Sequence, residues 1–255
     1  MKNQVPHIGK YLQRKFNKCL SKENKFALLL SFITHHVKMF YWIVSICLFI
    51  LLCILLRTVY VLLEVKNETR SLYELASHKK KLKTLIILGS GGHSTEMLRL
   101  VETLNRKIFT PKFYIVASSD SKSKEKLFDM EKCSGKNTLY HVYDIPRSRK
   151  VHQSYVTSVF TTLYSIMYSI PLMLQIRPDL ILCNGPGTCI PICVIAFLMR
   201  VLYVSDSVIV FVESICRVKS LSLSGVILYY FADVFLVQWE ELLNKYKRAK
   251  YIGRF

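Results

Sequence analysis

Apolar runs and polar breaks divide the chain into one long apolar segment and a later series of shorter ones. Residues 40–56 contain no charged side chain, and the apolar run resumes after Arg57. A transmembrane helix needs roughly 20 mainly apolar residues, with about 17 at the lower end, and an arginine near its end can reach the interface. We therefore predict a transmembrane anchor over residues 39–63, between a basic N-terminal extension (1–38) and a polar juxtamembrane linker (64–83).

From residue 84 onward, apolar runs of strand length alternate with segments of helical periodicity. The predicted strands are 84–88, 112–117, 138–143, 179–183, 207–212 and 233–237. The predicted helices begin after residue 92 and then cover 122–136 (with a loop), 153–176, 188–200, 222–232 and 240–247. Continuously apolar strands that alternate with helices predict an α/β domain over residues 84–255, with a Rossmann-like parallel sheet buried on both faces.

Two uncharged runs in this domain, residues 153–176 and 180–199, also approach the length of a membrane span. The first run is rich in Ser, Thr and Tyr and contains Pro171, and the second is interrupted by glycines and a proline near Asn184. We interpret both as parts of the globular domain, the first exposing an apolar face to the bilayer surface. The sequence leaves open whether residues 153–176 touch the bilayer.

A turn with three glycines in four positions follows the first predicted strand, over residues 89–94. Glycine allows a backbone to approach a ligand closely, and the N-terminus of the helix behind it attracts anions. A P-loop would need a lysine after its last glycine, and the dinucleotide motif a third glycine where Ser94 stands. The alternatives are a phosphate-binding turn and a plain tight turn. The predicted phosphate-binding residues are Ser90, Gly91, Gly92 and Ser94.

Other polar residues follow the predicted strands, at the sheet edge where ligands of parallel sheets bind. These crevice residues are His93, Arg147, Asn184, Gly185, Gly187, Glu213 and Arg217. The helix N-terminus beside His93 disfavours the charged imidazole, and a neutral His93 can act as a catalytic base or simply cap the loop. Glu213 can be the catalytic base in place of His93, bind a sugar hydroxyl or pair with Arg217. Arg147 and Arg149 can hold a diphosphate or belong to a solvated basic patch at the membrane surface. The 184–187 turn can bind an anion or only reverse the chain.

Composition narrows the choice of partners. The chain has 36 Lys and Arg against 17 Asp and Glu, a formal net charge of +19, which favours an anionic partner such as a phospholipid, nucleic acid or phosphorylated substrate. Aromatic platforms for single strands and zinc-knuckle spacing are missing, so nucleic acid is not expected. The eight cysteines show neither a paired framework nor metal-ligand spacing, and we expect four in apolar segments, Cys183, Cys189, Cys193 and Cys216, to be buried as small apolar groups. We therefore predict no metal and no cofactor, and a reducing, cytosolic surrounding.

Several motifs in one order carry a family resemblance: LGSGGHSTEMLRL, IPRSR, PDLILCNGPGTCIPICVIAFL, VESICRV and the terminal YIGR. Together they resemble the membrane-anchored subunit of the two-chain UDP-N-acetylglucosamine transferase of asparagine-linked glycosylation. The resemblance covers residues 84–255 and an anchor before them. That family is similar to the N-terminal half of MurG, a GT-B glycosyltransferase. The resemblance therefore implies half of a GT-B fold, with most of the UDP-GlcNAc site on a separate soluble catalytic subunit.

The resemblance also implies a location and a reaction. The globular domain would lie on the cytosolic face of the endoplasmic reticulum membrane, anchored by one span. It would contribute the acceptor side for transfer of a second, β1,4-linked GlcNAc to GlcNAc-diphosphate-dolichol, and would be inactive alone. The alternative is a membrane scaffold with no residue in the chemistry. Residues 1–38 lie outside the resemblance, and a lumenal basic tail runs against the positive-inside rule, so their topology stays open, as does the oligomeric state.

Overall fold

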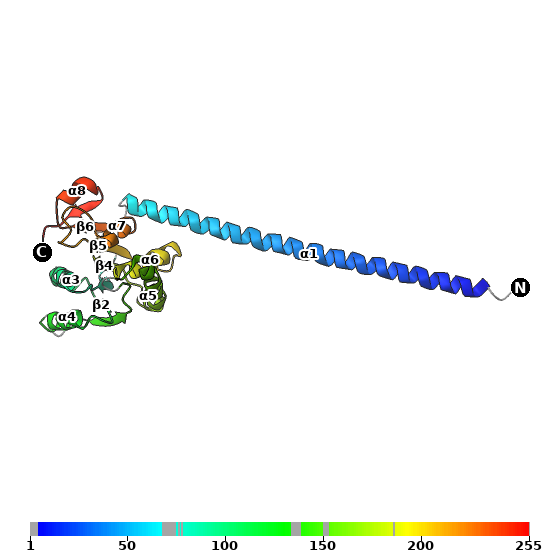
Figure 1. Cartoon of the computed structure of the whole chain (residues 1–255), viewed down its shortest axis with the longest axis horizontal. Coiled ribbons are helices and arrows are strands. Elements are labelled where there is room, and N and C mark those ends of the chain that lie inside the picture. The colour runs from blue at the N-terminus through cyan, green and yellow to red at the C-terminus, as the bar shows by residue number, and fades with distance from the viewer. Residues whose placement is uncertain are drawn as a thin grey trace. The chain divides into compact units, whose positions relative to one another are not determined.

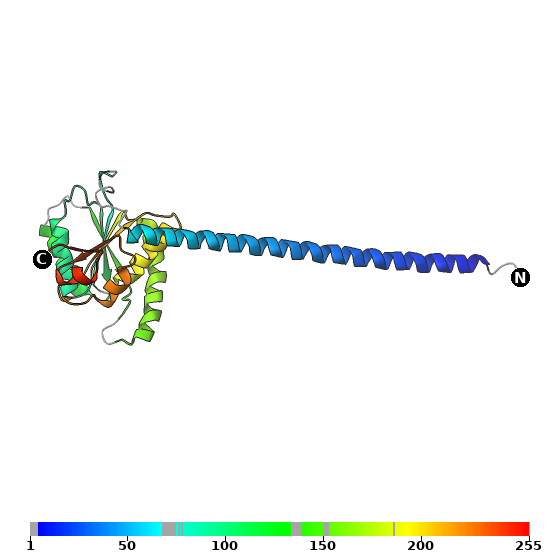
Figure 2. The same cartoon turned by 90° about the horizontal axis from the view of Figure 1, so that it is seen from above.

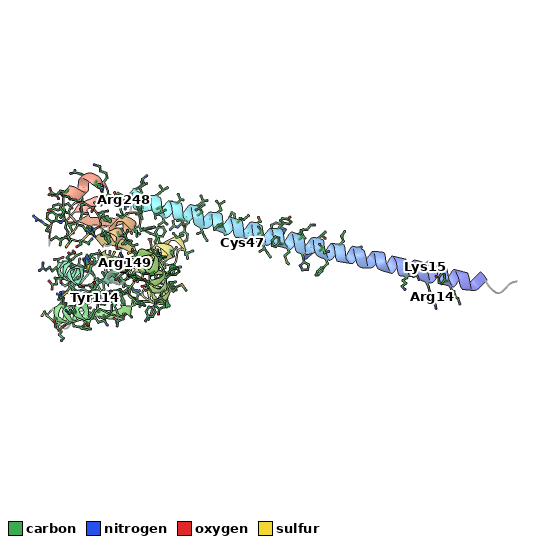
Figure 3. The ribbon with its side chains drawn as sticks, viewed as in Figure 1. Arg14, Lys15, Cys47, Tyr114, Arg149 and Arg248 are labelled. Carbon is green, nitrogen blue, oxygen red and sulfur yellow. The ribbon has the colours of Figure 1, made fainter. Side chains whose placement is uncertain are left out.

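The computed structural model describes residues 5–67, 75, 77, 79–133, 139–149, 153–185 and 187–254. Their contacts form two compact units, Met1–Leu56 and Arg57–Phe255. The first unit contains most of one long helix, α1 (Val5–Lys66) (Figure 1). On this helix Arg14 and Lys15 are exposed (Figure 3), and Leu30–Lys66 is a candidate membrane span. The helix crosses the predicted boundary at residue 39 without a break, so the limits 39–63 remain a prediction.

The described part of the second unit contains a parallel sheet in the order β3-β2-β1-β4-β5-β6-β7. The strands are β1 (Thr84–Ile87), β2 (Lys112–Ala117), β3 (Tyr140–Ile145), β4 (Leu180–Asn184), β5 (Val208–Val212), β6 (Val234–Val237) and β7 (Ala249–Tyr251). The first strand pairs with two neighbours, Thr84 lying opposite both Lys112 and Leu180. This is the Rossmann-type order, whose switch point lies between β1 and β4. The predicted α/β class is confirmed.

Helices cover both faces of this sheet (Figure 2). They are α3 (Gly92–Thr103), α4 (Ser121–Cys133), α5 (Tyr155–Ile176), α6 (Cys189–Val201), α7 (Leu223–Leu228) and α8 (Glu241–Lys245). Successive residues of a strand point to opposite faces. Leu85 and Ile87 therefore join the core beneath α5 and α6, whereas Ile86 joins the core beneath α3 and α4. Because both faces are covered, the strands read as continuous apolar runs.

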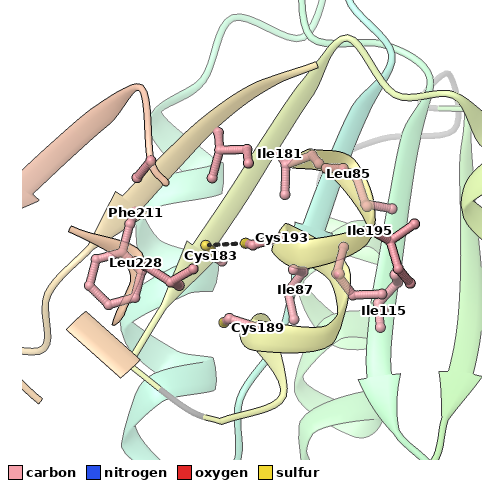
Figure 4. Close-up of a cluster of buried hydrophobic side chains, with 14 of the residues drawn as sticks. Leu85, Ile87, Ile115, Ile181, Cys183, Cys189, Cys193, Ile195, Phe211 and Leu228 are labelled. Carbon is pink, nitrogen blue, oxygen red and sulfur yellow. Dashed lines mark hydrogen bonds between the residues drawn. The ribbon is translucent and has the colours of Figure 1, made fainter. Parts of the chain in front are cut away.

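Three cysteines, Cys183 on β4 and Cys189 and Cys193 on α6, lie in the core between this strand and this helix (Figure 4). The sulfur atoms of Cys183 and Cys193 are 3.6 Å apart. Hydrogen bonds with Cys189 and Cys193, together with burial, raise the pKa of the Cys183 thiol well above its ordinary value. The Cys183 thiol therefore stays protonated, and the three side chains pack as small apolar groups. Burial is confirmed for Cys183, Cys189 and Cys193, whereas Cys216, expected to be buried with them, is exposed.

The structure differs from the sequence prediction mainly at the edges of the sheet. Strand β3 begins and ends two residues later than the predicted 138–143, and β7 was not predicted at all. Both are edge strands with half-exposed or exposed residues, and short edge strands that carry charges, such as Asp144 and Lys250, give only a weak apolar signal. Helix α7 has six residues rather than the predicted 222–232.

The last turns of α1 belong to the second unit. Val61 is fully buried and packs with Phe197 and Val201 on α6. The guanidinium of Arg57 lies 4.1 Å from the ring centroid of Tyr203. The helix therefore ends within the packing of the globular unit.

Candidate functional site

The glycine turn after β1 offers accessible backbone. Gly91 has a φ of +66°, a conformation that L side chains rarely adopt. Open space surrounds the positions where Gly91 and Gly92 would carry a Cβ, so a ligand can approach their backbone. Helix α3 begins at Gly92 with no acidic residue in its first turn, so nothing there neutralises the positive end of the helix. This geometry is compatible with the predicted anion site.

The turn after β4 lies directly against the first one. Gly185 has a φ of +43°, and a Cβ at this position would lie 2.7 Å from Nδ1 of His93. The imidazole therefore packs on the backbone of Gly185, and only glycine fits. Since β1 and β4 are neighbours at the switch point of the sheet, the two turns form one site.

The imidazole of His93 is held in its neutral form. Burial lowers the pKa of His93, the positive charge of Arg217 lowers it further, and the negative charge of Glu96 opposes both. Its Nδ1 atom is buried and finds no hydrogen-bond partner among the described residues. The imidazole is not part of the lining of the cavity described below, but it packs on Gly185, which is. A neutral imidazole in this position is suited to accept a proton. The neutral state agrees with the expectation from the helix N-terminus, but burial is its main cause.

Asn184 has a different part in the site from the predicted anion binding. Its Nδ2 donates to the carbonyl oxygen of His93 at 2.8 Å and, at 3.5 Å, to Oε2 of Glu96. Because both neighbours are acceptors, the orientation of the amide is fixed. The Oδ1 atom is buried without a partner among the described residues. The donor that would bind an anion is thus already used to hold the two turns together.

Glu96 is a further residue of the site that was not predicted from the sequence. Besides Asn184, it accepts a hydrogen bond at 3.0 Å from the hydroxyl of Ser214. Its position three residues after His93 is the available sequence signal, since residues i and i+3 share a helix face.

A cavity of about 800 Å³ opens beside the two turns. The predicted residues that line it are Ser90, Arg147, Arg149, Gly185, Gly187 and Arg217. The other polar lining residues are Ser148, Ser158, Thr162, Thr188, Ser222 and Ser224. Its apolar lining comes from α5, α6 and α7 and consists of Val159, Leu163, Ile190, Leu223 and Ile227. One cavity therefore combines arginines and hydroxyls with apolar helix surfaces, which suits an amphiphilic anion.

Helix α5 holds the arginine segment of the cavity in place. Thr161 donates to the carbonyl of Ser148 at 2.5 Å, and Ser165 donates to the carbonyl of Pro146 at 3.0 Å. The guanidinium of Arg149 (Figure 3) donates to the carbonyl of Gln153. The hydroxyl of Ser148 is buried and has no partner among the described residues, so it is available to a ligand. Sequence reasoning missed Ser148, whose only signal is its place between two arginines.

Glu213, predicted as a second catalytic residue, is fully buried and does not line the cavity. Its carboxylate accepts hydrogen bonds from the backbone N–H groups of Ser214 at 3.0 Å and Ser222 at 2.9 Å. Burial raises the pKa of Glu213, although these donors oppose the shift. The described structure shows these hydrogen bonds rather than an ion pair with Arg217. The arrangement indicates a structural support of the loop that carries Arg217.

Ser94, predicted to bind phosphate, also points away from the cavity. Its hydroxyl is buried, donates to the carbonyl of Gly89 and lies 2.5 Å from the hydroxyl of Ser123. Ser123 in turn donates to Asp120 at 2.6 Å. A buried polar network of this kind fixes local geometry. Ser94 thus supports the glycine turn from inside the domain.

Comparison with known proteins places this geometry in a family. Residues 84–255 match the family described as oligosaccharide biosynthesis protein Alg14 like. The UDP-N-acetylglucosamine transferase subunit ALG14 of Mus musculus is 50% identical over 183 residues, covering 69% of this chain and 84% of the relative. The protein of the same name from Homo sapiens is 46% identical over 182 residues, covering 69% of this chain and 84% of the relative. The protein of this name from Yarrowia lipolytica is 42% identical over 205 residues, covering 80% of this chain and 94% of the relative.

A solved structure, MurG of Acinetobacter baumannii, is similar with a TM-score of 0.46 and 15% identity, over 62% of this chain and 42% of that chain. The match to the family covers the whole sheet together with its helices. It includes both turns and the arginine segment that surround the cavity. The chain therefore belongs to the Alg14-like family of oligosaccharide biosynthesis proteins.

Proposed function

We propose that this chain is the membrane-anchored, acceptor-side subunit of a UDP-N-acetylglucosamine transferase. The complex would add a second, β1,4-linked GlcNAc to GlcNAc-diphosphate-dolichol at the cytosolic face of the endoplasmic reticulum. Relatives with 42–50% identity are named as subunits of a UDP-N-acetylglucosamine transferase. The observation that carries the proposal is the cavity beside His93, which combines arginines with apolar helix surfaces. An acceptor that joins a diphosphate to an isoprenoid chain needs both.

Each part of the acceptor has a matching part of the cavity. Arg147 and Arg217 face the diphosphate as cationic donors, and the open N-terminus of α3 adds its partial positive charge. Val159 and Leu163 of α5 offer apolar contact to the first isoprene units. The sugar then lies toward the turns that hold His93.

His93 supplies the base. It takes the proton from the acceptor's 4-hydroxyl while that oxygen forms a bond to the anomeric carbon of the donor sugar. The bond from the anomeric carbon to the UDP phosphate breaks in the same step, and UDP leaves with the electron pair. The lowered pKa of His93 keeps the imidazole ready to accept this proton at neutral pH.

A soluble partner would bring UDP-GlcNAc to this site. The described domain contains one Rossmann-like sheet, and the donor nucleotide would occupy a second domain on the other chain. We expect the partner near residues 233–255, where β7 pairs with β6 and forms one edge of the described sheet. This chain alone is then inactive.

The membrane part of the proposal rests on two helices. The apolar segment of α1 is the single-pass anchor. Helix α5, which lines the cavity, exposes apolar side chains that include Val156, Phe160 and Met167. These side chains would rest on the bilayer surface. The lipid chain of the acceptor could then remain in the membrane while its head enters the cavity.

Reconstitution tests the proposal directly. The full chain is placed in liposomes with GlcNAc-diphosphate-dolichol and UDP-GlcNAc, and the product is measured by mass spectrometry with and without the soluble partner. Transfer should require both chains. Robust transfer by this chain alone contradicts the subunit role, and no transfer by the pair contradicts the proposed reaction.

Arg217→Gln separates an acceptor-binding subunit from a scaffold. Its matched control is Lys219→Gln, which removes the same charge from the same exposed loop but outside the cavity lining. We expect Arg217→Gln alone to raise KM for the acceptor by about tenfold or more, since a charged hydrogen bond is worth ~1.5–3 kcal/mol. Equal kinetics of the two variants in the assembled complex would favour a scaffold.

A further inference from the structure

Glu96 connects three segments that follow neighbouring strands of the sheet. It lies on α3, which follows β1, and its two carboxylate oxygens reach different elements. Oε1 accepts a hydrogen bond from the hydroxyl of Ser214 at 3.0 Å, and Oε2 lies 3.5 Å from Nδ2 of Asn184. Ser214 follows β5 and Asn184 ends β4. Because β1, β4 and β5 are adjacent, one side chain joins the loops at three consecutive strand ends.

Each of these contacts leads to a residue of the candidate site. Asn184 also donates to the carbonyl of His93 at 2.8 Å, so Glu96 and His93 share one amide. The carbonyl of Ser214 accepts from the backbone N–H of Arg217 at 3.0 Å, so the same serine holds the turn that carries this arginine. Glu96 is thereby linked to the imidazole on one side and to the cavity arginine on the other.

The carboxylate of Glu96 lies among neutral hydrogen-bond donors. Among the described residues it forms no ion pair, and its oxygens accept hydrogen bonds from neutral groups. Its charge acts on His93 through space. The charged groups that influence this imidazole are Glu96 on α3, which raises the pKa of His93, and Arg217 in the loop after β5, which lowers it.

We propose that Glu96 is a positioning residue of this site: its carboxylate holds Asn184 and Ser214, and through them keeps His93 and Arg217 in the arrangement that receives the acceptor. Its negative charge also stabilises the imidazolium that forms when His93 takes a proton. The turnover part of this proposal rests on the proposed transferase function, whereas the effect on the imidazole does not.

The test compares Glu96→Gln with Glu102→Gln in the full-length chain. Glu102 is an exposed residue of the same helix, so its replacement removes the same charge without touching the site. The titration of the His93 imidazole is followed by NMR in detergent micelles, with its signal assigned through His93→Gln. We expect Glu96→Gln to lower the pKa of His93 and Glu102→Gln to leave it unchanged.

Turnover is then measured with the soluble partner, GlcNAc-diphosphate-dolichol and UDP-GlcNAc. Glu96→Gln should reduce it about 10²-fold, the cost of displacing a reactive group by about 1 Å, while Glu102→Gln stays within about twofold of wild type. Circular dichroism checks that both variants fold. If Glu96→Gln does not fold, Ser214→Ala takes its place, since it removes one of the two contacts and should lower turnover alone.

A double-mutant cycle adds an independent test. Glu96 and Ser214 act through one hydrogen bond. The fold-loss of turnover in the double variant Glu96→Gln/Ser214→Ala should therefore be smaller than the product of the fold-losses in the two single variants. The proposal requires a lower pKa of His93, a loss of turnover and this non-additivity. Unchanged titration, unchanged turnover or additive losses each overturn it. If wild-type complex shows no transfer at all, the proposed function fails, and the titration of His93 still decides the role of Glu96.

Discussion

The carboxylate of Glu213 accepts two hydrogen bonds from Ser222, one from its backbone N–H at 2.9 Å and one from its hydroxyl at 3.1 Å. The two residues are the ends of the loop that carries Arg217. The Ser222 hydroxyl also accepts from the backbone N–H of Gly225 at 2.9 Å, which caps α7. A buried side chain thus closes the loop and starts the next helix.

Glu213→Gln should weaken folding more than chemistry. The amide has only one oxygen, so its NH₂ group must face a donor N–H of Ser214 or Ser222. An unsatisfied buried donor costs about 1–3 kcal/mol, and we expect the free energy of unfolding to fall by that amount in chemical denaturation. The control is Glu241→Gln at an exposed position. Loss of turnover in a variant with unchanged stability would instead assign Glu213 as the base.

His93→Ala should reduce turnover of the assembled complex about 10²–10⁴-fold, the usual contribution of a general base. Binding of the partner and affinity for UDP-GlcNAc should stay nearly unchanged, because the imidazole contacts Gly185 within this chain. His141→Ala, at an exposed position on β3, is the control. Near-normal turnover of His93→Ala with the partner bound would leave His93 as a loop-capping residue.

The pH dependence of kcat/KM should report the same imidazole. The base must be neutral to accept a proton, and the pKa of His93 lies below its ordinary value of 6.5, mainly through burial. The neutral form therefore persists to lower pH, and activity should fall on the acid side only below pH 6.5. An acid limb above this value that disappears in His93→Gln would contradict the lowered pKa.

Gly185→Ala and Gly187→Ala form a matched pair within one turn. At Gly185 a methyl group would collide with the imidazole of His93 and the φ of +43° would be strained, whereas Gly187 has open space and no positive φ. We expect Gly185→Ala to reduce turnover about 10²-fold by displacing His93, and Gly187→Ala to have a much smaller effect. Steady-state kinetics of both variants measure this difference, and equal losses would show that the packing on Gly185 is unimportant.

The exposed apolar face of α5 should bind membranes. A chain that begins at Arg57 lacks the anchor but keeps Val61, which is buried against Phe197. We expect this chain to sediment with vesicles and to be released by carbonate, as a peripheral protein is. Phe160→Glu should abolish sedimentation, and Leu139→Glu, at an exposed apolar residue outside α5, should not. Resistance to carbonate would show that α5 inserts.

The sequence predicted the centre of the sheet well because buried parallel strands have an unmistakable apolar composition. The bounds of β2, 112–117, agree with the prediction, and β4 and β5 differ by one residue at most at each end. Strand β7 could not be found this way, because two of its three residues are exposed. The strand ends also identified much of the cavity, including Arg147 and Arg217.

The orientation of single side chains was beyond the sequence. Ser94 points inward because its hydroxyl forms hydrogen bonds with Ser123 and with the carbonyl of Gly89. Neither contact can be recognised from the local periodicity of the sequence. Glu96 resembles any solvated glutamate on a helix until Asn184 and Ser214 are brought beside it by β4 and β5. Such long-range neighbours decide whether a polar residue supports a site or lines it.

The length of helix α6 fixes a distance within the globular unit. Thr188, just before its first residue, lines the cavity, and Val201 at its other end packs with Val61 in the last turns of α1. Its 13 residues, at about 1.5 Å per residue, span roughly 20 Å. This buried helix therefore keeps a constant distance between the cavity and the contact of Val201 with Val61. One inserted residue would lengthen the helix by about 1.5 Å and rotate its C-terminal end by about 100°.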